Sequence, residues 1–283
     1  MPDPGTISFF GAGRWGSGIE IPSADMDFWQ VKNVPQGAVE EKYYWSKATE
    51  SMRRCYVYLP AEYQNNPGKR YPVLYLQHGN AENEVGWSSQ GHTAQILDNL
   101  IAEGKAVPFI VVMDYGQSQN IHLVPPYAPQ QPAQPQQPRQ GQPGARASGP
   151  DAFQVVLLTD IIPMVEREYR VVADAQHRAL AGLSMGGQTR RITLANPTKF
   201  AYVGMFSGGV MSVEDIQAAA GFQQTNKVVF MSSGSKENPR VMEAAENLRK
   251  IGVNAVGYIS EGTAHEWHTW CRSLFEFAQI LFR

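Results

Sequence analysis

From Pro72 onward the sequence alternates short, continuous apolar runs with longer amphipathic ones, and no other feature constrains the fold as strongly. Strands covered on both faces have this apolar character. Repeated alternation of strand and helix predicts a mostly parallel sheet with helices on both of its faces. The predicted strands are PVLYLQHG, VPFIVVMD, RALAGLS, FAYVGMFSG, KVVFMSSG and NAVGYIS, and the predicted helices cover residues 92–104, 153–169, 186–196, 240–252 and 266–282.

Two β-rich runs, KYYWSKA and MRRCYVYLP, come before this alternation. The short ATES segment between them is typical of a connection between antiparallel strands. Residues 1–35 are rich in Gly, Pro and isolated aromatics, so we expect an extended arm or linker there, the tail of a possible preceding module. Residues 36–283 are then one domain of the α/β class.

The segment 125–150, rich in Pro and Gln, breaks the pattern. It has too few apolar residues to offset the entropy lost on ordering, which is typical of a flexible insertion. It follows the VPFIVVMD run, so we expect it to leave the sheet at a strand end.

Charge and hydropathy exclude several function classes. The 283 residues include 24 Lys and Arg and 26 Asp and Glu, a formal net charge of −2. This balance gives no electrostatic attraction to nucleic acid or to an anionic membrane. No apolar run approaches the roughly 20 residues of a membrane-spanning helix. The start, MPDPGTISFF, lacks the pattern of a signal peptide, although the chain can be a part of a longer secreted protein.

The cysteines, Cys55 and Cys271, do not have the spacing of a zinc site, and neither follows a strand-to-helix turn. We expect two buried free thiols, with a disulfide between the two as the alternative. The sequence predicts no metal site.

The sharpest chemical signal is GLSMGG, residues 182–187, which fits G-x-S-x-G between a predicted strand and a predicted helix. This is the context of a nucleophile elbow, in which the serine sits on a strained turn at the end of a strand. Gly182 and Gly186 lack side chains that would clash across the turn. Ser184 is therefore the candidate nucleophile.

A serine needs a base to remove its proton, and on this kind of fold the order along the chain is Ser, acid, His. Two histidines follow Ser184, namely His265 and His268, both in EGTAHEWHTW. His265 is nearer the end of the preceding strand, so we expect it to be the base. His268 is expected in the first turn of the last helix.

The acid should lie between Ser184 and His265. Glu237 is the candidate directly after a buried strand, in VVFMSSGSKENP, and would orient and stabilise the imidazole. An exposed loop glutamate is the alternative interpretation of Glu237. The other acids in this interval are Glu214 and Asp215, expected in the first turn of a helix, Glu243 and Glu246, expected on an amphipathic helix, and Glu261.

Acyl transfer also needs N–H donors for an oxyanion. The backbone N–H of Met185, which follows the nucleophile, is one candidate. The second is the N–H of Asn80, in the LQHGNAEN loop after the first parallel strand. His78 precedes the serine, out of order for a base, and is expected to be structural.

Taken together, HGNAENEVGW, ILDNLIAEGKAVPFIVVMD, IIPMVEREYRV, RALAGLSMGG, KFAYVGMFSG and AHEWHTW resemble carbohydrate esterase family 1, from about Val34 to the C-terminus. The resemblance is closest to its feruloyl esterase branch, the esterase D group. It implies an α/β-hydrolase fold, no cofactor and cleavage of hydroxycinnamoyl or acetyl esters on arabinoxylan. The family's acid is commonly Asp, so Glu237 is a departure that keeps the carboxylate.

The resemblance implies a secreted or cell-envelope protein that acts on feruloylated arabinoxylan or its oligosaccharides. A hydroxycinnamate calls for an aromatic-lined pocket, and the candidate substrate-binding residues are Trp87, Trp267 and Trp270. An acetyl-xylan esterase and an S-formylglutathione hydrolase-like small acyl esterase are the alternatives with the same triad. A non-catalytic carbohydrate-binding protein is the alternative from another class.

Overall fold

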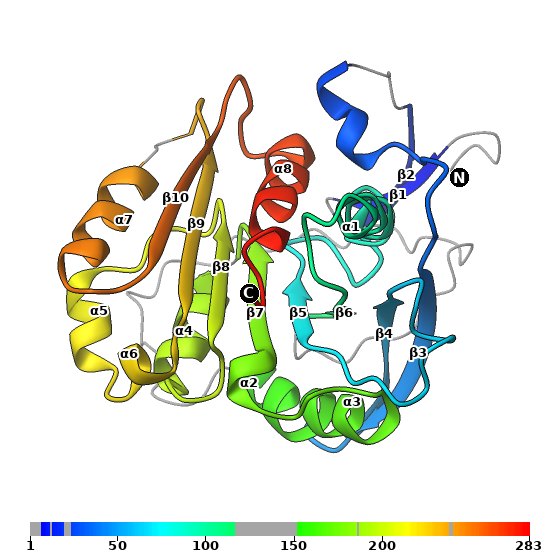
Figure 1. Ribbon diagram of the computed structural model, residues 1–283, viewed down its shortest axis with the longest axis horizontal. Helices are drawn as coiled ribbons and strands as arrows, with labels where there is room; N and C mark the ends of the chain where they lie inside the picture. Colours follow the sequence, from blue (N-terminus) through cyan, green and yellow to red (C-terminus); the bar gives the residue numbers. More distant parts are fainter. Residues whose placement is uncertain (1–6, 12, 20–23, 117–151, 186, 238–239) are drawn as a thin grey trace, which may run out of the picture.

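The computed structural model describes residues 7–11, 13–19, 24–116, 152–185, 187–237 and 240–283 (Figure 1). The predicted insertion at 125–150 and Gly186 lie outside this part of the chain. The described strands are β1 (Ile7–Gly11), β2 (Arg14–Gly18), β3 (Ala38–Ser46), β4 (Ser51–Leu59), β5 (Val73–Gln77), β6 (Ile110–Asp114), β7 (Arg178–Leu183), β8 (Tyr202–Phe206), β9 (Val228–Gly234) and β10 (Ala255–Ser260).

The described α-helices are α1 (Thr93–Ala102), α2 (Ala152–Val156), α3 (Ile162–Glu168), α4 (Gly187–Ala195), α5 (Val213–Ala218), α6 (Phe222–Thr225), α7 (Val241–Lys250) and α8 (Trp267–Ala278). The predicted helix over 153–169 is divided into α2, a π-helical turn (Leu157–Ile161) and α3, with Pro163 at the start of α3. The three pieces form one continuous helical segment, so Pro163 removes a backbone donor inside it, and the π-helical turn directly precedes this point. None of the described helices is long and apolar enough to cross a lipid bilayer.

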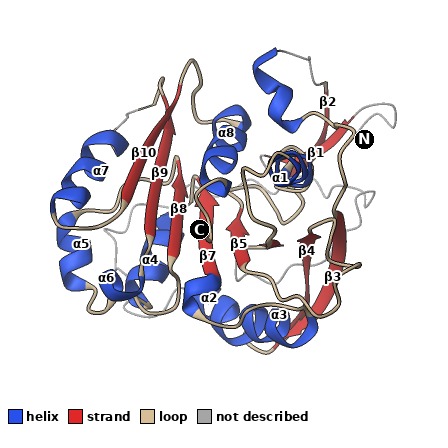
Figure 2. Cartoon of the chain, viewed as in Figure 1, coloured by secondary structure: helices blue, strands red, loops and turns tan. Residues whose placement is uncertain are grey.

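The main sheet has eight described strands in the order β10-β9-β8-β7-β5-β6-β4-β3. The strands from β10 to β6 are parallel to their neighbours, while β4 and β3 are antiparallel. The predicted mixed architecture is therefore confirmed, including the antiparallel pair at its start (Figure 2).

Helices cover both faces of this sheet, because alternate residues of each buried strand point to opposite sides. One core lies between the sheet and helices α1 and α8, with Leu74 and Leu76 of β5 on that side. Val73 and Tyr75 face the opposite core, which α2 and α3 cover. Helices α5 and α7 close the far end of the sheet over β8, β9 and β10.

Of the two expectations for residues 1–35, an extended arm or the tail of a preceding module, the extended conformation does not hold for much of the part that the structure describes. β1 and β2 form an antiparallel hairpin, and a 3-10 turn (Ala24–Trp29) packs against the domain. Trp29 is 5% exposed within the core that includes α1 and α8. Asn99 of α1 donates hydrogen bonds to the carbonyls of Phe28 and Gln30. These contacts join residues about 70 positions apart, so no local periodicity signals them.

Both cysteines are free and buried, Cys55 in β4 and Cys271 in α8. This confirms the expected pair of free thiols, and the alternative disulfide is absent.

The carboxyl ends of the parallel strands meet along one edge of the sheet, which is where open α/β sheets bind ligands. Ser184 follows β7, Glu237 follows β9 and His265 follows β10. The fold thus places three residues that are distant in sequence at the same edge of the sheet.

Candidate active site

Ser184 lies on the tight turn between β7 and α4 and has φ +52°, in the left-handed region that side-chain-bearing residues rarely adopt. Its N–H donates to the carbonyl of Phe206 in β8, at 2.7 Å. A Cβ at Gly182 would lie 3.0 Å from the Cβ of Gln77, so a larger residue would push β7 away from β5. The strained serine on a strand-to-helix turn is the geometry that the G-x-S-x-G pattern predicts.

His265 lies in the loop between β10 and α8 and contacts Ser184 directly. Its Nε2 is 2.7 Å from Ser184 Oγ, and its Nδ1 is 2.8 Å from Glu237 Oε1. An ionised carboxylate can only accept a hydrogen bond, so the Nδ1 atom that contacts Glu237 carries the proton. Nε2 is then free to accept a hydrogen bond from the serine hydroxyl. The ring of Trp270 packs edge-on against the imidazole, with centroids 5.2 Å apart.

His268, the rejected alternative, lies in the first turn of α8. Its ring packs against Trp29 of the N-terminal segment, with centroids 5.7 Å apart. The structure therefore brings His265, and not His268, to Ser184.

Glu237 is held by three donors. Besides His265, it accepts hydrogen bonds from the N–H of Gly234 at 2.6 Å and from the hydroxyl of Ser207 at 2.7 Å, both at Oε2. Burial by itself raises the pKa of the carboxyl group, but these hydrogen bonds outweigh burial and hold the pKa of Glu237 below its usual range. The side chain is therefore ionised near neutral pH and can stabilise a protonated imidazole.

Two residues that support Glu237 are absent from the sequence analysis. Ser207 directly follows β8 and has φ +50°, a strained conformation that aims its hydroxyl at Glu237. A Cβ at Gly234 would lie 2.5 Å from the carbonyl oxygen of Thr263, so this glycine lets the acid loop approach the His265 loop. The run FSGG after a buried strand is the sequence signal that could have pointed to Ser207.

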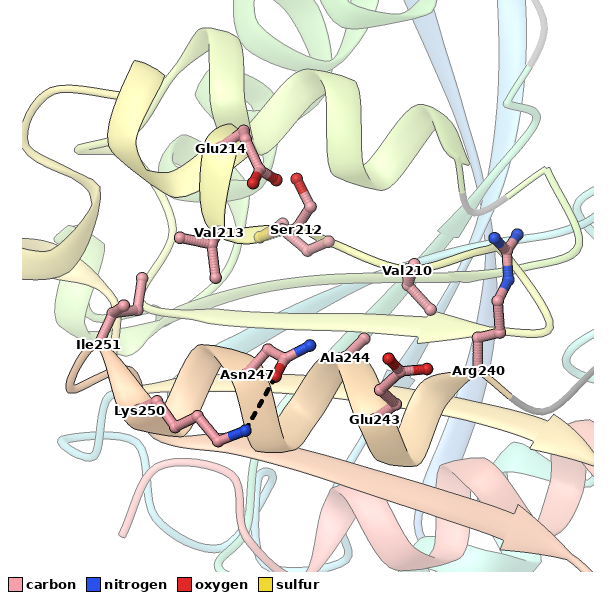
Figure 3. A pocket seen from close by; sticks show the side chains of 11 residues that line it. Val210, Ser212, Val213, Glu214, Arg240, Glu243, Ala244, Asn247, Lys250 and Ile251 are labelled. Atoms are coloured by element: carbon pink, nitrogen blue, oxygen red, sulfur yellow. Dashed lines mark hydrogen bonds between the residues drawn. The ribbon is translucent and has the colours of Figure 1, made fainter.

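The other candidate acids are engaged elsewhere. Asp215 forms the capping box of α5 and pairs with Arg190. Glu214 and Glu243 line a groove of about 430 Å³ between the start of α5 and α7, in which Val210 and Ile251 supply apolar surface (Figure 3). None of the predicted site residues lines this groove. Glu246 and Glu261 are exposed.

Met185 follows Ser184 in the chain, and Asn80 follows Gly79, where a Cβ would lie 3.1 Å from the Cβ of Ser184. Within the described residues, neither the N–H of Asn80 nor that of Met185 donates to a protein acceptor. His78 holds the base of the Asn80 loop, since its Nδ1 lies 2.7 Å from the carbonyl oxygen of Gly79 and its Nε2 accepts from the N–H of Gly116. Burial lowers the pKa of His78 to about 4, so it is neutral in this position, away from the serine.

Of the three tryptophans predicted to contact substrate, two are buried. Trp87 is 1% exposed and Trp270 is 6% exposed, so neither offers a ring face to a ligand, and the structure contradicts the prediction for both. The Trp87 indole N–H donates to the carbonyl of Gln77, which explains its burial. Trp267 is half-buried and packs edge-on against both other rings.

The arrangement of these groups agrees with a family assignment made from the whole sequence. The profile of the family described as "Putative esterase" matches residues 46–278. The chain belongs to this esterase family. Membership makes it a serine ester hydrolase, as the elbow predicted.

A curated relative, the endo-1,4-beta-xylanase/feruloyl esterase of Xylanibacter ruminicola, is 41% identical over 99% of the chain, which spans 36% of the relative's length. Endo-1,4-beta-xylanase Y of Acetivibrio thermocellus is 27% identical over 81% of the chain, which spans 21% of that relative. The chain thus covers about a third or less of these two larger proteins.

Solved structures support the fold. The feruloyl esterase module from Clostridium thermocellum, in complex with sinapinate, has a TM-score of 0.71 and 20% identity, and covers 97% of this chain and 96% of its own. A CE1 ferulic acid esterase from Anaeromyces mucronatus, in complex with ferulic acid, has a TM-score of 0.70 and 22% identity. The match covers 94% of this chain and 98% of that esterase. The α/β-hydrolase fold is confirmed.

Proposed function

We propose that this domain releases ferulate or a related hydroxycinnamate from plant cell-wall arabinoxylan through an acyl-enzyme intermediate. In this proposal Ser184 is the nucleophile, His265 the general base and Glu237 the acid. The observation that carries it is the unbroken hydrogen-bonded chain from Ser184 through His265 to Glu237, assembled from three strand ends. The N–H groups of Asn80 and Met185 stabilise the oxyanion.

In the first step His265 Nε2 takes the proton of Ser184 Oγ while Oγ attacks the ester carbonyl carbon. The carbonyl oxygen becomes an oxyanion that the two N–H groups bind, and the ionised Glu237 stabilises the imidazolium. The bond to the alcohol oxygen then breaks, and His265 returns the proton to the departing sugar. The acyl group remains on Ser184.

In the second step a water molecule attacks the acyl carbon, and His265 accepts its proton. The bond between the carbonyl carbon and Ser184 Oγ breaks, the proton returns to the serine, and the carboxylic acid leaves. No group outside the protein and water is needed to balance either step.

The substrate class is inferred from the relatives. The Xylanibacter protein is named as a xylanase and feruloyl esterase, and this chain aligns to it over almost its entire length. We extend the proposal to an extracellular or cell-envelope location, where a polymeric cell-wall substrate is found. Trp267, the half-exposed member of the three tryptophans, is the proposed aromatic wall of the pocket.

Parallel assays of methyl ferulate and p-nitrophenyl acetate test this function. A feruloyl esterase should show a kcat/KM for methyl ferulate that is at least comparable to that for the activated acetate. High activity on the acetate with none on methyl ferulate or feruloylated oligosaccharides would instead favour an acetyl or other small acyl esterase. Absence of hydrolysis of any of these esters would favour a non-catalytic carbohydrate-binding protein.

A further inference from the structure

Glu82 lies beside the proposed nucleophile but has no role in the mechanism above. It belongs to the loop between β5 and α1, and its Oε2 accepts a hydrogen bond from the N–H of Gly79 at 3.3 Å. A Cβ at Gly79 would lie 3.1 Å from the Cβ of Ser184 and 3.6 Å from Glu82 Oε2. The carboxyl group and the serine thus both lie near the position that a Cβ of Gly79 would occupy.

The same carboxyl group reaches a second loop. Its ionised form is also favoured by the side chain of Trp267, the first residue of α8, two positions after His265. Trp267 is itself held between Trp87 and Trp270, with ring centroids 5.2 Å and 5.3 Å from its own. Glu82 therefore links the loop that carries the Asn80 N–H to the segment that carries His265.

The charges around Glu82 are few. Burial raises its pKa to about 7, although the N–H of Gly79, the Trp267 side chain and the charge of His265 each act to lower it. Ser184 faces it from the β7–α4 turn and carries no charge. Glu84, two residues further along the same loop, is paired with Arg54 at 2.7 Å. Of these neighbours, His265 is the one whose charge acts on Glu82.

We propose that Glu82 is a positioning residue for the proposed hydrolysis: the hydrogen bond that it accepts from Gly79 aligns the Asn80 N–H with the oxyanion, and its interaction with the Trp267 side chain fixes Trp267 beside the His265 loop. This inference rests on the proposed function, since it presupposes an oxyanion at that place. Displacement of an oxyanion donor reduces stabilisation of the transition state more than it reduces the affinity for substrate.

The test compares E82Q and E82A with E261Q as a matched control, because Glu261 is an exposed carboxylate four residues before His265. Loss of a whole oxyanion donor costs roughly 100- to 1,000-fold in kcat, so a displaced donor should cost about tenfold in E82Q and more in E82A. KM should change by less than about twofold. E261Q should keep wild-type kinetics.

A pH profile separates this role from a merely structural one. The pKa of Glu82 is raised to about 7, so its ionisation should contribute to the pH dependence of kcat in wild type, and this contribution should be absent from E82Q. W267F, which keeps a ring but removes the indole N–H, should lower kcat as well. In the double variant the two losses should be less than multiplicative, because both remove the same link.

The following outcomes decide the proposal. A folded E82Q with wild-type kcat and an unchanged pH profile overturns it, as does a loss confined to KM. If E82A does not fold, E82Q alone still decides. If wild type hydrolyses no ester, or S184A hydrolyses as fast as wild type, the proposed function fails and this inference fails with it.

Discussion

The turn that carries Ser184 and the loop that carries Asn80 lie side by side, yet they are held in different ways. Ser184 is fixed by its own short turn between β7 and α4, with a strained φ and small neighbours. The Asn80 loop, residues 78–87, is held by distant groups. Gly13 donates to the carbonyl of Ala81, and Arg54 pairs with Glu84.

The difference predicts two kinds of sensitivity to mutation. In the serine turn one side chain carries the chemistry, so its loss should abolish turnover and leave the fold intact. In the Asn80 loop several contacts share the task of positioning one N–H. Loss of any single contact in this loop should therefore lower kcat only in part, and it should also lower the free energy of unfolding.

The largest expected effect is that of S184A. Loss of the nucleophile of such a triad costs roughly a million-fold in kcat in a well-studied protease. Labelling by a fluorophosphonate should stop, and the melting temperature should stay within a few degrees of wild type. A variant that keeps more than about a hundredth of the wild-type rate would place the nucleophile elsewhere.

The pair H265A and H268A comes next. H265A should abolish measurable turnover because no other base contacts Ser184 Oγ within the described residues. H268A should change kcat little, since its ring packs against Trp29. Initial rates on p-nitrophenyl acetate would decide, and equal losses in the two variants would refute the assignment of the base.

E237Q should lose about a hundred-fold in kcat with little change in KM. It keeps the shape but removes the charge that stabilises the imidazolium, a change that costs about ten-thousand-fold in a serine protease. We expect less here because the carboxyl group is 17% exposed and its partner imidazole 49% exposed, so solvent shares the stabilisation. E237D should be intermediate. Wild-type activity in E237Q would point to another acid.

The smallest effect on rate should come from H78N, and its effect on stability should depend on pH. The pKa of His78 is lowered to about 4, against about 6.5 for an unfolded histidine. Between these values the unfolded chain binds the extra proton, so the free energy of unfolding falls as the pH drops through this window. Between pH 7.5 and pH 4.5 the free energy of unfolding of wild type should fall by about 2–3 kcal/mol more than that of H78N.

Urea unfolding of the two proteins at both pH values measures this difference directly. If the free energy of unfolding falls equally in wild type and H78N, then folding does not prevent the protonation of His78. The loop would then be less tightly held than its hydrogen bonds suggest, and the contrast with the serine turn would weaken.

Much of the fold follows from local patterns. The buried strands β5 to β10 appear in the sequence as apolar runs, and Gly104 and Gly252 end helices α1 and α7 with φ +66° and +85°. The N-terminal segment was mispredicted because Trp29 and the β1–β2 hairpin owe their positions to residues far along the chain. Trp87 was misassigned because a sequence shows an aromatic residue near a site but not the backbone carbonyl that its indole N–H binds.

The sequence by itself determined the order Ser184, Glu237, His265 and the strand ends on which they lie, because hydrophobic period and G-x-S-x-G spacing are local properties of the chain. The tertiary structure decided that His265 contacts Ser184, that Glu237 contacts His265, and which donors hold Glu237. Those outcomes depend on the approach of loops separated by 28 and 81 positions. Such approaches are set by the packing of the whole sheet and by close contacts such as that of Gly234 with Thr263.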